Sequence, residues 1–137
     1  MTAYRTLSID TTRTLPYDTG AEWLPLRADL GVTAFGFNAW RAAKGQEVVE
    51  RHVEAEPGAT EKRHQEAYVV VRGHARFTVD GDEIDGPAGT IVFIEDPEVE
   101  RVAVAEEDGT VVLAIGAEPG VAFEPSRWEE RELAKRG

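Results

Sequence analysis

Residues 64–81 have the sequence HQEAYVVVRGHARFTVDG, and this stretch decides the fold of the chain. Tyr, Val, Phe and Thr dominate it, and these residue types favour a pleated, half-buried surface. Gly73 and the Asp80-Gly81 pair are turn signals. The pattern therefore predicts two strands joined as a hairpin at Gly73.

Three polar side chains enter the first of these strands at a spacing of two. Residues two apart on a strand face the same side, so His64, Glu66 and Tyr68 are expected in line. Burial and mutual repulsion raise the pKa of carboxyl groups inside a barrel, so Glu66 or Glu100 could act as a general base near neutral pH, and Glu66 is the candidate. Two roles stay open for the Tyr68 hydroxyl, which either contacts a ligand or bonds to a strand neighbour.

The rest of the chain also favours strands. Short segments rich in Val, Ile, Phe and Ala recur between Gly, Pro and Asp turn signals, which indicates an all-β barrel or sandwich. Residues 90–94 are almost continuously apolar, as expected for a strand covered on both faces. Residues 82–89 are rich in Asp, Gly and Pro and are expected to form a tight connection. The other predicted strands are residues 32–42, 47–54, 99–105 and 110–116.

The two ends are expected to pack around this core. The alternation of Leu7 and Ile9 with polar residues predicts an edge strand at residues 3–10, followed by an apolar cover segment that ends at Gly31. Ser126 with Glu129 resembles a capping box, which predicts a short peripheral helix over about 126–136. A chain of 137 residues fits one domain, here residues 1–137 with a core barrel over about 32–116.

Composition excludes several classes of function. The formal net charge of −11 makes nucleic acid and anionic membranes poor partners. The absence of Cys excludes disulfides, thiolate nucleophiles and Cys-ligated metals. No apolar run is long enough for a signal peptide or a membrane span, so we expect a soluble, cytoplasmic protein.

The motifs resemble those of the cupins. The first cupin motif runs G-x5-H-x-H-x(3,4)-E-x6-G, and Glu66 with Gly73 matches its second half; Gly89 matches the first glycine of the second motif. The resemblance is clearest over residues 47–116. It implies a double-stranded β-helix, or jelly-roll barrel, and pairing as a homodimer.

The sequence departs from the cupin pattern at the metal-binding histidines. The positions expected for the His-x-His pair carry other residues, and the histidine of the second motif falls on Glu100. The usual three-His-one-Glu site is thereby reduced to Glu66. The first predicted function is therefore a barrel that binds a small organic molecule, with metal absent or weakly held, in a pocket formed by His52, His64, Glu66, Tyr68 and Glu100.

A metal-dependent enzyme is the alternative. His52-Val53-Glu54 has the His-x-His spacing with Glu in the second place, so His52, His64 and Glu66 together supply two imidazoles and one carboxylate. Such a set binds divalent iron, manganese, nickel or zinc and would suit an oxygenase or isomerase. Otherwise His64 is a pocket-rim residue that bonds to Glu66 or to solvent. Arg101, beside Glu100, either reaches a carboxylate ligand or lies at the surface, and the surface position is the one expected.

Overall fold

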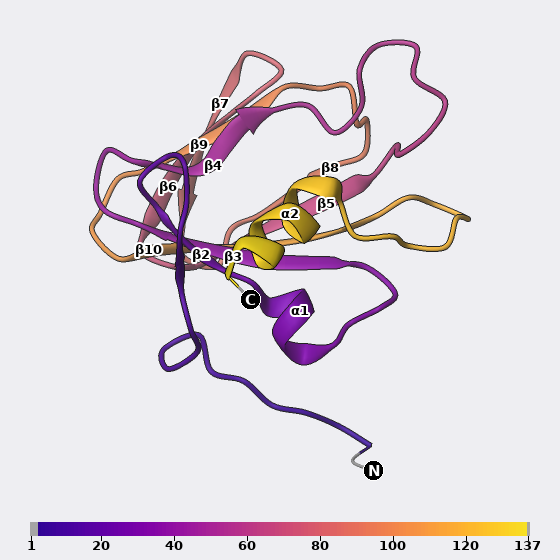
Figure 1. Ribbon diagram of the computed structural model, residues 1–137. Helices are drawn as coiled ribbons and strands as arrows, with labels where there is room; N and C mark the ends of the chain where they lie inside the picture. Colours follow the sequence, from indigo (N-terminus) through magenta and orange to yellow (C-terminus); the bar gives the residue numbers. More distant parts are fainter. Residues whose placement is uncertain (1–2, 137) are drawn as a thin grey trace.

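The computed structural model describes residues 3–136, and within that range the protein is mostly β-structure with a short C-terminal helix (Figure 1). The strands predicted around residues 32–42, 47–54, 99–105 and 110–116 are confirmed. The elements are β1 (Leu15–Pro16), β2 (Glu22–Leu24), α1 (Leu26–Leu30), β3 (Gly36–Ala42), β4 (Glu47–His52), β5 (Gln65–Arg72), β6 (His74–Val79), β7 (Asp82–Pro87), β8 (Ile91–Ile94), β9 (Arg101–Ala105), β10 (Thr110–Ala117) and α2 (Arg127–Arg136).

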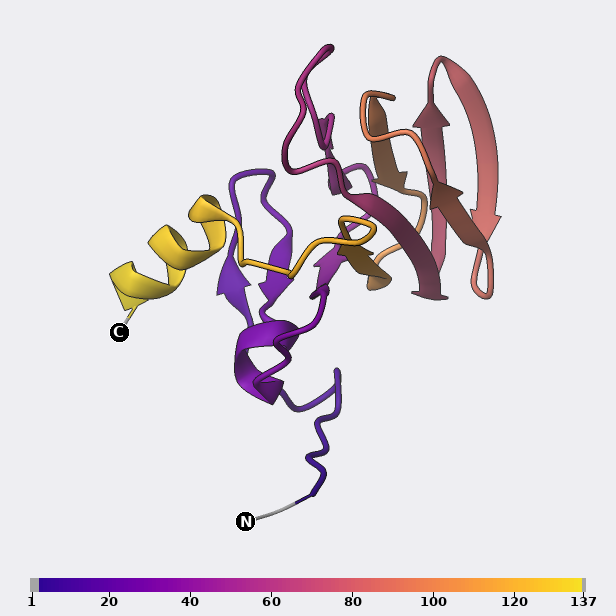
Figure 2. The ribbon, with the colours of Figure 1, turned by 90° about the vertical axis from the view of Figure 1, so that its right-hand side faces the viewer.

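The strands form two antiparallel sheets. The order is β1-β2-β3-β10-β5-β8 in the larger sheet and β4-β9-β6-β7 in the smaller. The chain crosses between the two sheets repeatedly from β3 onward, which is the connectivity of a jelly roll (Figures 1 and 2). The expected all-β fold is confirmed.

The main hydrophobic core lies between the two sheets. Tyr68 and Val70 of β5, Phe77 of β6 and Val112 of β10 are buried in it. A second apolar cluster covers the outer face of the larger sheet, beneath α1. Period-two alternation in each strand supplies the inward side chains, as the sequence predicts.

Gly73 is a corner between the sheets, and the predicted hairpin between β5 and β6 is wrong. β5 pairs with β8 and β10, whereas β6 pairs with β7 and β9. Gly73 has φ +74°, and a Cβ there would lie 2.4 Å from Oγ1 of Thr110. Glycine is therefore required where the chain passes from one sheet to the other.

The hairpin that does form joins β6 to β7. Asp80 and Gly81 both have positive φ, at 51° and 82°, and connect the paired residues Val79 and Asp82. A two-residue turn with both φ positive matches the twist of the flanking strands. Residues 82–87 thus form strand β7, which corrects the expected connection at 82–89.

β8 is the edge strand of the larger sheet, and its predicted burial on both faces is wrong. Val92 and Ile94 are buried, whereas Ile91 and Phe93 are 67% and 58% exposed. Alternate side chains of this apolar run therefore point into the core and out to the exposed face of the sheet.

The predicted edge strand at residues 3–10 does not form. Leu7 and Ile9 pack against the outer apolar cluster, so the alternation reflects one-sided burial without strand pairing. The cover segment is confirmed, and it includes the unpredicted five-residue helix α1, which begins after Pro25 and ends at Gly31 with φ +73°.

The predicted C-terminal helix is confirmed as α2. Trp128 lies 5.1 Å from Trp23 of β2 between ring centroids, which places the helix beside β1 and β2 (Figure 2). Neither helix in the described residues has the length and apolarity needed to cross a lipid bilayer.

Candidate functional site

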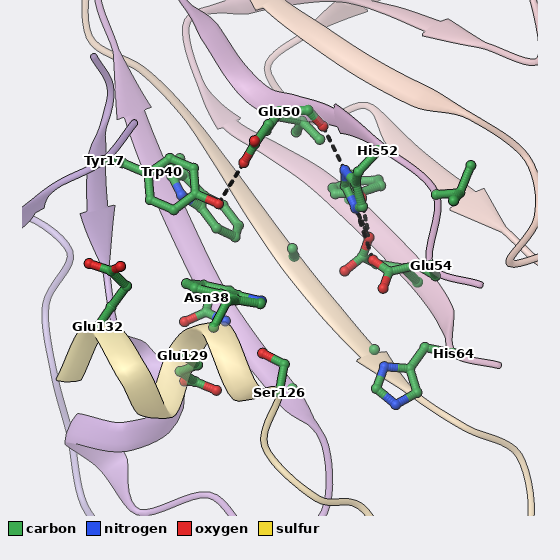
Figure 3. Close-up of a pocket in the computed structure, with 18 of the residues that line it drawn as sticks. Tyr17, Asn38, Trp40, Glu50, His52, Glu54, His64, Ser126, Glu129 and Glu132 are labelled. Atoms are coloured by element: carbon green, nitrogen blue, oxygen red, sulfur yellow. Dashed lines mark hydrogen bonds and ion pairs between the residues drawn. The ribbon is translucent and has the colours of Figure 1, made fainter. Parts of the chain in front are cut away.

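A cavity of about 500 Å³ lies between the strands and α2. Asn38 and Trp40 of β3 lie on one side, and Glu129 and Glu132 of α2 face them (Figure 3). Tyr68 of β5 also lines the cavity. Because these residues come from distant parts of the sequence, the cavity is a product of the complete fold.

Five side chains form a cluster at one end of this cavity, which we name the His52 cluster: His52, Glu54, Glu66, Tyr68 and Arg101. β4 supplies His52, and backbone bonds from Glu54 and Ala55 to the Pro97 carbonyl hold the chain just after it. Glu66 and Tyr68 face the same side of β5, as predicted, and the Tyr68 hydroxyl donates a hydrogen bond to Glu66.

The geometry of His52 identifies its protonation state. Nδ1 lies 2.6 Å from the Glu50 carbonyl oxygen, and Nε2 lies 3.0 Å from Oε1 of Glu54. Both neighbours are acceptors when Glu54 is ionised, so both ring nitrogens carry hydrogen. Burial alone would lower the pKa of His52, but the carboxylates of Glu54 and Glu66 outweigh it and raise that pKa to about 10.

The two carboxyl groups respond differently to this environment. Burial acts to raise the pKa of Glu54, but the contacts with His52 and Glu66 prevail and lower it to about 2. The pKa of Glu66 is raised, chiefly by burial and further by the charge of Glu54. Burial and the same carboxylates hold the pKa of Tyr68 well above its ordinary value. Glu54 is thus the firmly ionised carboxylate of the pair.

Arg101 is buried inside the fold, so its expected surface position is wrong. Its side chain is 0% exposed, and Nη1 lies 3.3 Å from Oε1 of Glu66 and 3.9 Å from Oε1 of Glu54. Nε donates to the Val99 carbonyl, 3.0 Å away. When all four charged groups are ionised, Arg101 and His52 balance the two carboxylates.

The structure separates the remaining predicted site residues. His64 lines the cavity, but it precedes β5, and its ring packs 6.0 Å from that of Phe123. No hydrogen bond joins it to Glu66 within the described chain. Glu100 is 55% exposed and pairs with Arg51 at 2.5 Å, away from the residues that line the cavity.

Aromatic and acidic side chains form the opposite end of the cavity. The ring of Tyr17 lies 5.8 Å from that of Trp40 and 5.9 Å from that of Trp128. The Tyr17 hydroxyl donates to Glu50, 2.7 Å away, and burial followed by this bond raises the pKa of Tyr17. Nε1 of Trp40 is buried and has no hydrogen-bond partner among the described residues.

By distance alone, part of the His52 cluster could hold a metal ion. The ligand atoms of His52, Glu54 and Glu66 lie within 4.8 Å of one another, and imidazole with carboxylate is a common donor set. However, Oε1 of Glu66 already accepts from Tyr68 and Arg101, and the Arg101 guanidinium places a fixed positive charge against both carboxylates. The residues as arranged therefore do not fit a divalent ion.

The predicted pocket did not include Glu54, which lines the cavity, or Arg101, which lies outside the lining and contacts the carboxylates of Glu54 and Glu66. The predicted ligand set was His52, His64 and Glu66, and the structure has Glu54 in the place of His64. The reason is that the segment at the end of β4, and not the one before β5, approaches Glu66. A signal for Arg101 exists in β9, where residues 101, 103 and 105 share a face. Ala103 and Ala105 are small and buried, which marks that face as inward.

Comparison with known proteins agrees with the fold. No protein-family model matches the sequence, and no curated protein matches it. A cupin protein from Bacteroides fragilis has a similar structure, with a TM-score of 0.65 and 20% identity over 92% of this chain and 93% of that chain.

Two further solved structures are similar over most of both chains. A sugar phosphate isomerase from a cupin superfamily, from Silicibacter pomeroyi, has a TM-score of 0.63 and 17% identity over 83% of this chain and 76% of that chain. A predicted oxalate decarboxylase from Thermotoga maritima has a TM-score of 0.61 and 17% identity over 82% of this chain and 97% of that chain. The cupin resemblance is thus confirmed at the level of the fold.

Proposed function

We propose that this chain, which has the cupin fold, binds a small, uncharged, oxygen-bearing organic molecule in the cavity beside the His52 cluster. The cavity itself carries the proposal. Its volume of about 500 Å³ is in the range of small-molecule sites, and polar groups from β3, β4, β5 and α2 converge on it.

The charge of the lining supports an uncharged ligand. Six lining residues are acidic, and the fixed positive charges among them are Lys62 and Arg131. Such a surface repels a multiply charged anion. Phosphorylated sugars and dicarboxylates, which the descriptions of two similar structures suggest, are therefore less suited to this cavity than neutral sugars or polyols.

Trp40 supports an oxygen-bearing ligand. Buried hydrogen-bond donors almost always have an acceptor, and Nε1 of Trp40 has none in the described part of the chain. Because this nitrogen has almost no solvent-accessible surface, a hydroxyl or carbonyl oxygen of the ligand would satisfy it once a neighbouring side chain moves aside. The aromatic faces of Trp40 and Trp128 give apolar contact surface beside that donor.

A binding screen tests this proposal. Neutral sugars and polyols would be compared with their phosphorylated and carboxylated counterparts by thermal shift and calorimetry. We expect a neutral compound to bind more tightly than its charged counterpart, and Trp40→Phe to weaken that binding about 3- to 10-fold by removing one hydrogen bond. Preferential binding of the charged compounds, or unchanged affinity in Trp40→Phe, would contradict the proposal.

Glu66 is the proposed general base for a bound molecule. It lines the cavity, and its raised pKa gives it greater basicity than an ordinary glutamate. The second candidate is a metal-dependent enzyme, which the short distances among His52, Glu54 and Glu66 favour and the charge of Arg101 opposes. Iron, manganese, nickel and zinc are its candidate ions, and the metal measurement below decides between the two.

A homodimer is the proposed assembly. β8 is an edge strand with unpaired backbone groups on its outer side, and its exposed side chains Ile91 and Phe93 adjoin Val71 of β5, which is 38% exposed. A second copy of the chain that covers this surface would remove apolar area from water.

A further inference from the structure

We propose that the guanidinium of Arg101 is the permanent cation of the His52 cluster, and that replacing it with a neutral side chain turns His52, Glu54 and Glu66 into a divalent metal site. Removing the charge of Arg101 would leave the two carboxylates short of one positive charge. The inference does not depend on which molecule the cavity binds, so each proposal can fail without the other.

Strand register brings Arg101 to this position. Arg101 pairs with His52 of β4 and with Val79 of β6, so it lies in the middle of the smaller sheet. Its side chain is fully buried, and its Nη1 lies within 4 Å of a carboxylate oxygen of both Glu54 and Glu66. Because arginine stays protonated in proteins, this charge cannot be discharged by losing a proton.

Hydrogen bonds account for only part of the contacts of Arg101, since its Nε and Nη1 donate to Val99 and Glu66. Nη2 of Arg101 is buried without a hydrogen-bond partner within residues 3–136. The positive charge of Arg101, in contrast, lies close to the carboxylates of both Glu54 and Glu66.

The same charge opposes a divalent ion. An ion held by His52, Glu54 and Glu66 would lie within a few ångströms of the guanidinium, in a partly buried site where repulsion is weakly screened. It would also compete with Arg101 for Oε1 of Glu66. A neutral side chain of similar length removes both obstacles and leaves the three side chains in place, so that a bound ion would displace the proton from Nε2 of His52.

Metal binding by four proteins without affinity tags tests this inference: the wild type, Arg101→Met, Arg101→Lys and Arg51→Met. Arg51 is the matched control because it is an arginine that pairs with a glutamate at an exposed site, with its side chain 56% exposed. Zn²⁺ and Mn²⁺ would be added separately at neutral pH, excess ion removed by dialysis and the bound ion measured by mass spectrometry. Calorimetry would supply the dissociation constants.

We expect Arg101→Met to bind about one equivalent, at least about 100-fold more tightly than the wild type. The wild type, Arg51→Met and Arg101→Lys should retain less than about a tenth of an equivalent, because each keeps a cation at position 101. Stoichiometric metal in the wild type that disappears in His52→Ala would overturn the inference. Folded Arg101→Met without metal binding would overturn it as well.

A double variant covers the case in which Arg101→Met does not fold. Arg101→Met with Glu66→Gln removes one charge of each sign, so His52 and Glu54 still balance. We expect this protein to be more stable than Arg101→Met alone and to bind no Zn²⁺, because one ligand is missing. Equal instability of the single and double variants would contradict the role of Arg101 as a charge-balancing cation.

Discussion

Glu129 of α2 and Arg27 of α1 form a buried ion pair across 102 positions of sequence. Nε of Arg27 donates to both carboxylate oxygens of Glu129 at 3.1 Å, and the two side chains are 13% and 3% exposed. Burial raises the pKa of Glu129, and Arg27 partly offsets that effect. Since Glu129 also lines the cavity, this ion pair attaches α2, which forms one wall of the candidate site, to α1 in the N-terminal segment.

We predict that Arg27→Met destabilises the protein by about 3–5 kcal/mol, because it leaves a buried carboxylate without its partner. Glu130→Gln is the control, since Glu130 is the exposed neighbour of Glu129 in the same helix. Chemical denaturation measures the free energy of unfolding, and limited proteolysis reports detachment of α2. Equal stability of Arg27→Met and the control would show that the pair does not hold the helix.

His52 should make stability fall at alkaline pH. Its pKa in the folded protein is about 10, against an ordinary value of 6.5, so folding favours the imidazolium. This contribution is complete below about pH 6.5 and is lost as pH rises toward about 10. The difference in unfolding free energy between the wild type and His52→Gln should therefore shrink across that window.

NMR titration of the imidazole provides a direct measurement of the same group. The ring resonances of His52, assigned by their loss in His52→Gln, should titrate near pH 10. Titration near the ordinary histidine value of about 6.5 would contradict the double hydrogen bonding of the ring to Glu50 and Glu54.

Local pattern was sufficient to predict the strands and the shared face of Glu66 and Tyr68, because side-chain alternation is a property of each strand alone. It could not distinguish a hairpin at Gly73 from a corner between sheets, since both use a glycine with positive φ. Arg101 and Glu129 were missed for a related reason. Each is a charged residue whose burial depends on a partner far away in sequence, and no local pattern encodes that partner.

Alanine substitutions at Gly73 and Gly109 should distinguish the cost of backbone strain from the cost of steric overlap. Gly73 and Gly109 have nearly the same φ, at +74° and +76°, but a Cβ at Gly73 would lie 2.4 Å from Oγ1 of Thr110, whereas a Cβ at Gly109 would meet no atom within 4 Å beyond its two chain neighbours. Gly109→Ala should cost about 1 kcal/mol through backbone strain alone. Gly73→Ala should cost about 1–3 kcal/mol more, because the new methyl group overlaps Oγ1 of Thr110. Equal losses in the two variants, measured by denaturation, would show that the corner can open to accept a side chain.

The exposed face of β8 gives the last prediction. Phe93 is 58% exposed on the edge strand, and a charged side chain there would be buried without a partner if a second copy covers it. We predict that the wild type is a dimer by light scattering and that Phe93→Glu shifts it to a monomer without lowering its thermal stability at low concentration. Val121→Glu is the control, because Val121 is a similarly exposed apolar residue, at 56%, outside the strands. A dimer that persists in Phe93→Glu would place the interface elsewhere, and a monomeric wild type would contradict the proposed assembly.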